Sequence, residues 1–319
     1  MALPRILVAR RITEAAAARA RRDFDAVMAE QDMTADQAIA AAASHGAEAI
    51  LLGTACKLNA EAISRLPPCV KLLANSSVGY DHMDAKAAKA RGLIVTNTPD
   101  VLTDCTADLA FLLLLAACRR AHEYEGIMRA GWGTTLGLPD MLGIRPSGKA
   151  LGIVGMGRIG RAMAQRARGF GMRILYHNRT RLSPELEQGA EYFATLEEML
   201  PHSQILSLHL PGGAATGTVM TAAAFAALPR GAVFVNSARG SVVDEDALLQ
   251  ALTSGHLFAA GLDVFHDEPN FDKRFAELPN VFLTPHVASA TIETRDAMGL
   301  KALDNIAAVL SGKPPIDPV

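Results

Sequence analysis

Short runs of apolar residues alternate with longer, alanine-rich stretches along the first part of the chain. The apolar runs have the length and composition of strands that are buried on both faces. The expected strands are 5–9, 24–30, 48–53, 70–75 and 93–97. The expected helices between them are 13–20, 34–45, 59–66 and 84–92. This alternation predicts a parallel sheet that is covered by helices on both sides.

A proline-punctuated stretch, Asn97–Asp100, precedes a long helix that we expect to start near Leu102 and to run through Arg119 and Arg120. A loop rich in glycine and proline follows, from Gly131 to Gly148. A second alternating series then has expected strands at 150–155, 173–177, 205–210, 232–236, 258–264 and 281–286. A last helical segment is expected from about Thr291 to Leu310.

The two series predict an α/β protein with two doubly wound, parallel-sheet domains. Residues 1–99 and 290–319 are expected to form a flavodoxin-like substrate domain, to which the final helix returns. Residues 100–289 are expected to form a Rossmann-type dinucleotide domain. Ligands of such folds bind at the carboxyl ends of the strands, so we expect the site in an interdomain cleft.

Composition narrows the class of protein. The chain has 319 residues, 50% of them apolar and 20% charged, which is typical of a globular enzyme. A net charge of -2 gives no basic field for nucleic acid. Four scattered cysteines indicate no metal site, and they favour a reducing, cytoplasmic location. No signal peptide is expected, and the most apolar segment, Leu109–Cys118, is too short to cross a membrane.

Gly155, Gly157 and Gly160 form a GxGxxG pattern between an expected strand and an expected helix. The first glycine permits a tight turn, the second lets the backbone approach a pyrophosphate, and the third lets the helix pack close to the strand. The start of the helix then offers unpaired N–H groups to the phosphates. The pattern alone is weak evidence, but the strands and helix around it supply the context that it requires. We therefore expect a dinucleotide site here.

The end of the next expected strand lacks the acidic residue that would bind the adenosine ribose of NAD. Asn178 stands in its place, and its neutral side chain does not repel a 2′-phosphate. Arg179 and Arg181, on either side of Thr180, offer charge-assisted donors to that phosphate. Arginines in a surface loop are also common without any such role. The stretch favours NADPH as cofactor and leaves NADH open.

Polar residues follow three expected strands of the second series. Arg239 comes after one strand, Asp263 lies at the end of another with Glu268 in the loop beyond it, and His286 comes after the apolar part of a third. Because the carboxyl ends of parallel strands face the ligand crevice, these loops can converge on one bound molecule. Reduction of a 2-keto acid needs such a set of groups: a clamp for the carboxylate, a hydride donor and a proton donor for the oxygen.

Residue chemistry assigns a role to each of these groups. The planar guanidinium of Arg239 suits a carboxylate, and the imidazole of His286, with an ordinary pKa of ~6.5, suits proton transfer. Glu268 beside the imidazole would favour its charged form. Taken singly, each residue also has an ordinary explanation, since an arginine after a strand is usually solvated and a glutamate before proline can sit in a turn.

Other histidines compete for the role of acid. His82 is the strongest of them because it lies near the expected substrate loop. His177 and His209 are expected to line the cofactor edge or to be structural. None of the other histidines occurs in a sequence context as informative as that of His286.

Taken together, these motifs resemble the D-isomer-specific 2-hydroxyacid dehydrogenase family. The resemblance covers nearly the whole chain and is strongest from Leu72 to Ala290. Its signature blocks, in the order of the family, are SSVGYDHMD, VTNTPDVLTDCTADLAFLLLLA, GKALGIVGMGRIG, FVNSARGSVVDEDAL, GLDVFHDEP and LTPHVASAT. Within the family, the chain looks most like the glyoxylate/hydroxypyruvate reductase branch.

The resemblance implies that Arg239, Glu268 and His286 are the substrate-binding arginine, the glutamate partner and the catalytic acid/base. It also implies that Val78 and Gly79 present backbone N–H groups to the substrate carboxylate. Residues 178–181 are called the ribose stretch below. Together with the glycine pattern and this stretch, the resemblance gives a set of expected cofactor contacts. These are Thr106, Gly155, Gly157, Arg158, Ile159, Gly160, Asn178, Arg179, Thr180, Arg181, Leu210, Pro211, Ser237, Ala238, Arg239, Asp263, His286 and Ser289.

The resemblance further implies a homodimer, formed by the helix from about Leu102 and by the loop after it, which includes Trp132. The expected partner is a small 2-keto or 2-hydroxy acid, with neither nucleic acid nor membrane. Alternatives remain at this point. They are a 2-ketogluconate or phosphite dehydrogenase activity, and a dinucleotide-sensing, corepressor-like binding protein of the same fold. Formate dehydrogenases carry glutamine at the position of Glu268, which argues against that activity.

Overall fold

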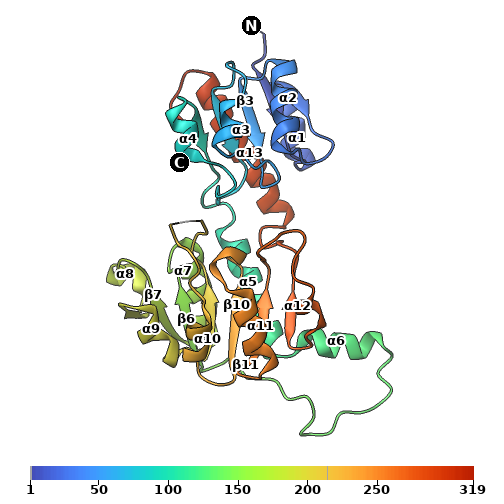
Figure 1. The fold of residues 1–319 in the computed structure, drawn as a ribbon, viewed down its shortest axis with the longest axis vertical. Coiled ribbons are helices and arrows are strands. Elements are labelled where there is room, and N and C mark those ends of the chain that lie inside the picture. Colours follow the sequence, from blue (N-terminus) through green and yellow to red (C-terminus); the bar gives the residue numbers. More distant parts are fainter. Residues whose placement is uncertain (1, 214) are drawn as a thin grey trace. The chain divides into compact units, whose positions relative to one another are not determined.

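The computed structural model describes residues 2–213 and 215–319. The chain divides into two compact units, of which unit 1 comprises the chain up to Leu102 together with Ser289–Val319, and unit 2 comprises Thr103–Ala288. Each unit is built from parallel strands with helices beside them (Figure 1). The expected fold class, two doubly wound parallel-sheet domains, is confirmed.

Unit 1 contains a five-stranded parallel sheet in the order β2-β1-β3-β4-β5. The strands are β1 (Arg5–Val8), β2 (Asp25–Met28), β3 (Ala49–Leu52), β4 (Leu72–Asn75) and β5 (Ile94–Thr96). The helices are α1 (Glu14–Asp23), α2 (Ala35–His45), α3 (Ala60–Ser64), α4 (Ala85–Ala90) and α13 (Ile292–Leu310). The last helix of the chain therefore belongs to unit 1, and it packs against α1 (Figure 1).

Side chains of these strands alternate between two cores, as the pleat of a strand requires. Leu7 and Ile50 face a core shared with α2, α3 and α4. Ile6 and Leu51 face a second core, shared with α1 and α13. Because both faces are buried, each strand reads as a continuous apolar run, and this is why the sequence pattern locates the strands so well.

Unit 2 contains a seven-stranded parallel sheet in the order β12-β11-β10-β9-β6-β7-β8, a Rossmann-type arrangement. The strands are β6 (Ala150–Val154), β7 (Arg173–His177), β8 (Glu191–Phe193), β9 (Ile205–Leu208), β10 (Ala232–Asn236), β11 (Leu257–Leu262) and β12 (Val281–Leu283). The helices are α5 (Thr103–Cys118), α6 (Ala121–Arg129), α7 (Arg158–Gly169), α8 (Pro184–Glu187), α9 (Leu196–Met199), α10 (Ala222–Ala227), α11 (Glu245–Thr253) and α12 (Arg274–Glu277), with 3-10 turns η1 (Leu200–His202) and η2 (Gly240–Val242).

The two faces of this sheet are again buried. Val233 and Val235 of β10 pack with α5 and α7, whereas Phe234 between them packs with α10 and α11. Residues at the carboxyl ends of β10 to β12 are thereby held on rigid strands, which is what a precise site requires.

Two sequence expectations need correction. The long helix ends at Cys118 and not at Arg120, because Arg120 adopts a left-handed backbone, with φ of 55°, and starts a new helix, α6. The edge strand β8 was not predicted, because its three residues are half-exposed and carry no apolar run. In the part of the chain that the structure describes, no helix is both long and apolar enough to span a membrane.

Candidate active site

The glycine loop after β6 has the geometry that its sequence predicts. Gly155 has φ of 93°, and a Cβ at this position would lie 2.6 Å from the carbonyl oxygen of His209. A Cβ on Gly160 would lie 2.3 Å from the carbonyl oxygen of Gly155, so only glycine lets α7 pack this close. A Cβ on Gly157 would meet nothing within 4 Å, so this position faces open space.

Open space at Gly157 coincides with the start of α7, whose N-cap makes no side-chain hydrogen bond. The N–H groups of the first turn are therefore available to an anion. In addition, the Ser237 hydroxyl after β10 is buried without a hydrogen-bond partner among residues 2–213 and 215–319. An open glycine, an uncapped helix start and an orphaned hydroxyl fit a bound dinucleotide.

Asn178 has a structural task that its sequence position did not reveal. Its Oδ1 accepts a hydrogen bond of 2.6 Å from the backbone N–H of Met156, inside the glycine loop. The side chain thus ties the end of β7 to the loop that would hold the pyrophosphate. An uncharged acceptor performs this task here.

The two arginines of the ribose stretch differ in their surroundings. Arg181 donates from Nε and Nη2 to the buried carboxylate of Glu187, at 2.8 and 3.2 Å. Its guanidinium also lies 5.6 Å from the ring centre of Tyr192. Arg179 and Thr180 are exposed, and within the described ranges the guanidinium of Arg179 has no partner. Arg179 is therefore the freer cation at this position.

Glu268 and His286 form a close pair in unit 2. Glu268 Oε2 lies 2.6 Å from Nδ1 of His286, and Oε1 accepts from the N–H of Phe265 at 2.9 Å. Both side chains of the pair are about one-third exposed, at 38% for His286 and 33% for Glu268. With Nδ1 taken by the carboxylate, Nε2 is the ring atom left for a substrate.

Several groups determine the ionisation of Glu268. Burial favours its neutral acid, but the hydrogen bond and charge of His286, the N–H of Phe265 and the charge of Arg239 outweigh burial and hold the pKa of Glu268 below its ordinary value. The carboxylate is therefore ionised near neutral pH and accepts a hydrogen bond from Nδ1. This arrangement fixes the ring orientation.

The backbone of His286 is held in a left-handed conformation, with φ of 53°, which is uncommon for a side chain of this size. Its N–H donates to the carbonyl oxygen of Asp263 at 2.8 Å. The Asp263 carboxylate, 0% exposed, accepts from Thr284 Oγ1 and from the N–H groups of Val287 and Ala288 at 2.6, 2.8 and 3.0 Å. Asp263 thus organises the whole histidine loop.

Arg239 follows β10 in a loop that a buried amide shapes. Asn236, 2% exposed, donates from Nδ2 to the carbonyl oxygen of Arg239 at 2.9 Å and accepts from the N–H of Ala238 at 3.0 Å. The Arg239 guanidinium donates from Nη1 to the Ala238 carbonyl at 2.7 Å and lies near enough to Glu268 to lower the pKa of that carboxyl. Unit 2 therefore brings Arg239, Glu268 and His286 together.

Unit 1 carries the loop after β4, which includes Val78 and Gly79. Buried Asn75 donates to the carbonyl oxygens of Ser77 and Gly79 at 3.0 and 2.9 Å, and Asn97 donates to that of Val78 at 2.9 Å. All three carbonyls are thus occupied. In the described part of the chain, nothing accepts a hydrogen bond from the N–H of Val78 or of Gly79. Two adjacent free N–H groups suit a carboxylate.

The sequence reasoning overlooked the amides that shape these loops. Asn75 ends β4 and Asn236 ends β10, and each is almost fully buried. The signal was present, because a polar residue closes an apolar run in both LLAN and AVFVN. The competing histidines have structural partners: His177 contacts the Phe193 carbonyl, and His209 contacts Ser207 Oγ at 2.9 Å. Burial lowers the pKa of His209 to about 4.

The remaining expected cofactor contacts lie in both units. Thr106 is buried on α5, whereas Ile159 and Leu210 are half-buried and Arg158 and Pro211 are exposed. Ser289 belongs to unit 1, and its carbonyl accepts from Arg295 Nε at 3.1 Å.

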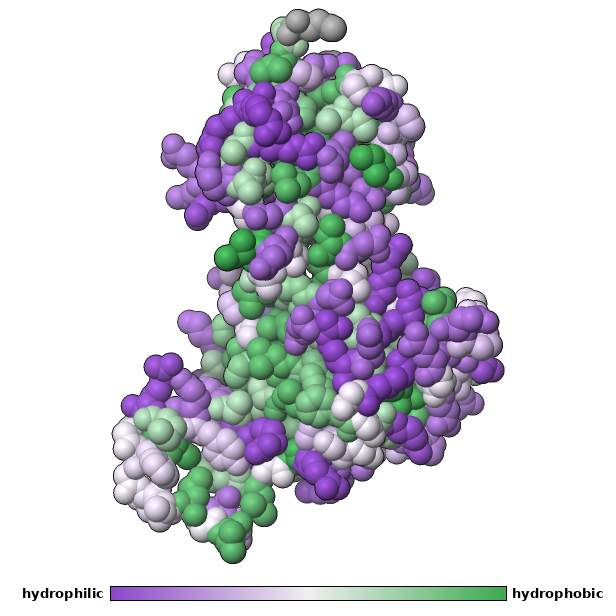
Figure 2. All heavy atoms as spheres, turned by 180° about the vertical axis from the view of Figure 1, so that it is seen from behind, coloured by the Kyte–Doolittle hydropathy of each residue, from purple (hydrophilic) through white to green (hydrophobic). Residues whose placement is uncertain are grey.

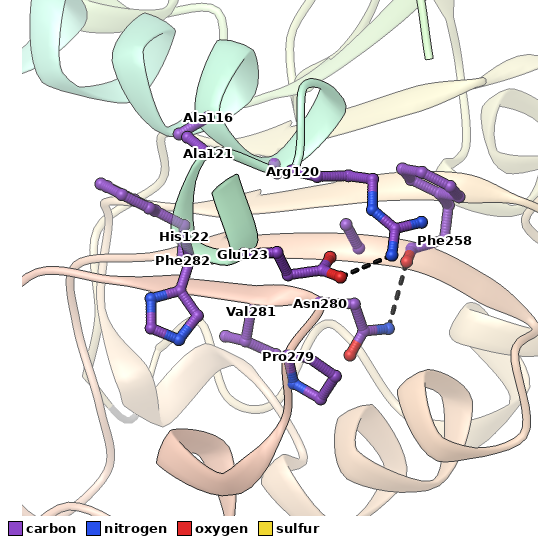
Figure 3. A pocket seen from close by; sticks show the side chains of 12 residues that line it. Ala116, Arg120, Ala121, His122, Glu123, Phe258, Pro279, Asn280, Val281 and Phe282 are labelled. Atoms are coloured by element: carbon purple, nitrogen blue, oxygen red, sulfur yellow. Dashed lines mark hydrogen bonds and ion pairs between the residues drawn. The ribbon is translucent and has the colours of Figure 1, made fainter. Parts of the chain in front are cut away.

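A small cavity of about 70 Å³ elsewhere in unit 2 does not belong to this site (Figure 3). It lies where Arg120 pairs with Glu123, beside Phe258, Asn280 and Val281 at the amino ends of β11 and β12. The residues of the candidate site follow the opposite, carboxyl ends of the strands.

Known proteins are similar to this chain over most of its length. The family model described as D-isomer specific 2-hydroxyacid dehydrogenase, NAD binding domain, matches residues 111–288. A glyoxylate reductase of Thermococcus litoralis is 45% identical over 254 residues, 78% of this chain and 76% of the relative. A glycerate dehydrogenase of Hyphomicrobium methylovorum is 39% identical over 320 residues, 98% of each chain. An NADPH-dependent glyoxylate/hydroxypyruvate reductase of Sinorhizobium meliloti, solved in complex with NADP and malonate, has a TM-score of 0.88 and 38% identity, covering 99% of this chain and 96% of that one.

A Rossmann-type sheet with a glycine loop after its first strand, together with an imidazole–carboxylate pair, is typical of a nicotinamide-dependent oxidoreductase. The chain belongs to the D-isomer specific 2-hydroxyacid dehydrogenase family. The resemblance drawn from the sequence motifs is therefore confirmed.

Proposed function

We propose that the protein reduces a small 2-keto acid, of the glyoxylate or hydroxypyruvate type, to the D-2-hydroxy acid at the expense of NADPH. The observation that carries this proposal is the 2.6 Å distance between His286 Nδ1 and Glu268 Oε2, with Arg239 close to the same carboxylate. The relatives named as glyoxylate reductase and glycerate dehydrogenase support the substrate class.

The residues fitted to hold the cofactor are the glycine loop with the start of α7, together with the Ser237 hydroxyl. When bound, the nicotinamide supplies a hydride to the carbonyl carbon of the substrate. The protein contributes position and charge, because a preorganised donor set stabilises the developing alkoxide without reorganisation. Asn178 supports this loop through its bond to Met156.

Substrate binding falls to Arg239 and to the free N–H groups of Val78 and Gly79. The guanidinium offers a planar pair of donors to the substrate carboxylate. Nε2 of His286 donates its proton to the carbonyl oxygen as the hydride arrives, while ionised Glu268 stabilises the imidazolium before transfer. After transfer, the neutral ring keeps its Nδ1 hydrogen bond, so its orientation does not change.

A kinetic panel of 2-keto acids with both NADPH and NADH tests this function. We expect turnover of glyoxylate and hydroxypyruvate to exceed that of bulkier 2-keto acids. Binding of the dinucleotide without turnover of any 2-keto acid would contradict an enzymatic role and favour a sensor. No specific structural observation favours a phosphite or 2-ketogluconate activity.

The preference for NADPH rests on Asn178, Arg179 and Arg181. Because Glu187 engages Arg181 through two hydrogen bonds, we expect Arg179 to contribute more to binding of the 2′-phosphate. Arg179→Ala removes one charge-assisted hydrogen bond, so KM for NADPH should rise by about tenfold while KM for NADH stays unchanged. Arg181→Ala is the matched comparison, with a smaller expected effect. Equal KM values for both cofactors in the unmodified protein would contradict the preference.

The homodimer remains a proposal. Figure 2 shows apolar side chains gathered over α5 and over the loop after α6. The exposed apolar residues of this region are Leu112, Met128, Trp132, Leu136, Leu138 and Leu142. A patch of this kind suits a second copy of the chain. Sedimentation should show a dimer, and Leu138→Arg with Trp132→Arg should shift it toward monomer, while a wild-type monomer at micromolar concentration would contradict the proposal.

A cytoplasmic location is also proposed. All four cysteines are free in the part of the chain that the structure describes, and two of them are buried. Free buried thiols are typical of proteins from a reducing compartment. Titration of freshly isolated, unfolded protein without reductant should find all four thiols, and finding a disulfide would contradict this location.

A further inference from the structure

Unit 1 contains an open pocket of about 620 Å³ that the proposed reaction does not use. It lies where β1 leads into α1, and the start of α13 closes one side. Its polar lining residues are Arg10, Arg11, Thr13, Asp32, Ser76 and Arg295. Pockets at the carboxyl ends of parallel strands are where folds of this type bind ligands.

Positive charge dominates this pocket. Three guanidinium groups face one carboxylate, and that carboxylate already caps the backbone, because Asp32 Oδ1 accepts from the N–H of Arg11 at 2.7 Å. Elsewhere in the unit, Arg19 and Arg65 are paired with aspartates at 2.6 and 2.7 Å. In residues 2–213 and 215–319, no such ion pair neutralises the guanidinium groups of Arg10, Arg11 and Arg295.

Arg10 is held firmly in place. Its side chain lies across Gly53, where a Cβ would come within 2.7 Å of Nη1, and Nη1 donates to Ser76 Oγ at 3.0 Å. Burial lowers the pKa of Arg10, the charge of Asp32 opposes this effect, and the like charge of Arg295 adds to it. Keeping two like charges together in a partly buried site is costly unless an anion joins them.

The start of α1 also contributes to the positive potential of this pocket. Its N-cap residue, Thr13, makes no side-chain cap, and within the described residues its buried hydroxyl has no hydrogen-bond partner. The N-caps of α2, α3, α4 and α13 in this unit all do cap their helices. The first turn of α1 contains one acidic side chain, Glu14, which pairs with Arg21 at 3.1 Å. The uncapped N–H groups at the start of the helix are therefore available to an anion in this pocket.

We propose that this pocket binds a multivalent oxyanion such as a phosphate group, held by Arg10, Arg11 and Arg295. The pocket is coupled to the substrate loop through Ser76. Its hydroxyl accepts from Arg10 and donates to the carbonyl of Leu52 at 3.0 Å, and Ser77 to Gly79 follow it directly. An anion that draws Arg10 toward itself changes the support of that loop.

Two sources can supply this chemistry: free phosphate acting as an effector, or a phosphate group carried by a 2-keto acid. The first would inhibit or activate without competing with the keto acid. The second would make free phosphate a competitive inhibitor. The site itself is defined by binding without cofactor or turnover, so its failure is separate from failure of the proposed reduction.

Isothermal titration with inorganic phosphate, at constant ionic strength with chloride as the balancing anion, tests the site. We expect one phosphate per chain. Arg295→Met and Arg11→Met should each weaken binding about ten- to hundredfold, as expected when a charge-assisted hydrogen bond is removed. Arg295→Lys keeps the charge and should retain part of the affinity for phosphate. This variant therefore shows whether weaker binding in Arg295→Met arises from loss of the charge or from a folding defect.

Two control variants locate the bound anion. Arg65→Met removes an exposed arginine of the same unit, and Arg239→Met removes the arginine of the candidate active site; both should bind phosphate as the unmodified protein does. Absence of saturable phosphate binding would overturn the proposal. Loss of binding in Arg239→Met together with normal binding in Arg295→Met would also overturn it, because the anion would then occupy the active site. The inhibition pattern against the 2-keto acid then assigns the source.

Discussion

Replacing Glu268 with glutamine isolates the charge that supports His286. The amide keeps the size of the side chain and can still form a hydrogen bond, but it cannot stabilise an imidazolium. The substitution removes a charge-assisted hydrogen bond of 2.6 Å between side chains that are about one-third exposed. Such a bond is roughly twice as strong as a neutral one, so we expect the barrier to rise by about 1.5 kcal/mol, or kcat/KM for reduction to fall roughly tenfold.

The pH profile shows whether this effect arises from charge. Without the carboxylate, the imidazole loses the negative charge beside it, so the basic limb of kcat/KM should move to lower pH. In the unmodified enzyme, the pKa of Glu268 lies below its ordinary value. Its support is therefore present at neutral pH and disappears only as the pH falls through that lowered value, so acid-side activity should persist through pH ~5.

Glu268→Asp is the matched control. Aspartate keeps the charge, but its side chain is one methylene shorter, so the carboxylate lies farther from the imidazole. We therefore expect kcat/KM to fall, while the basic limb of the pH profile moves less than in Glu268→Gln. Steady-state kinetics from acid to alkaline pH, with a saturating cofactor, measure both effects. An unchanged pH profile in Glu268→Gln would refute the reasoning and leave the residue with a structural role only.

Three further predictions concern the arginine, the histidine loop and the glycine loop. Arg239→Lys keeps the charge but not the planar fork, so KM for the 2-keto acid should rise by about ten- to hundredfold, and unaltered substrate kinetics would remove Arg239 from carboxylate binding. Asp263→Ala orphans the buried donors of the histidine loop and should lower the free energy of unfolding by about 3 kcal/mol or more; a change within about 0.5 kcal/mol in urea denaturation would contradict this role. Gly160→Ala places a Cβ 2.3 Å from the carbonyl oxygen of Gly155, so the affinity for the dinucleotide should drop by at least about tenfold. Fluorescence titration measures this affinity, and an unchanged value would show that α7 can move away from the glycine loop.

Much of the fold could be predicted because its strands are buried on both faces. Each such strand, for example Ala49–Leu52, is uniformly apolar, and the helices between the strands are rich in alanine. The edge strand Glu191–Phe193 could not be found this way, since it lacks a second buried face. The break at Arg120 was also missed, because a left-handed residue between two helices carries no signal when it is not glycine.

The residue types of the site could be predicted from the sequence, but the hydrogen bonds and ion pairs that hold these residues in place could not. The family motifs point to Glu268 and His286, which are 18 positions apart, and nothing in that spacing specifies a 2.6 Å hydrogen bond. Asp263 was expected at the cofactor, and the structure shows its carboxylate buried beneath the histidine loop, bound to Thr284 and two backbone N–H groups. The pairing of Arg181 with Glu187 likewise depends on tertiary structure that the charge pattern does not record.

Single-turnover reduction in His286→Ala tests the central claim most directly. Enzyme preloaded with the reduced cofactor is mixed with excess hydroxypyruvate, and oxidation of the nicotinamide is followed by its absorbance. If His286 donates the proton, the rate of the chemical step should fall by about 10²–10⁴ even when the cofactor is saturating. A single-turnover rate equal to that of the unmodified enzyme would contradict the account.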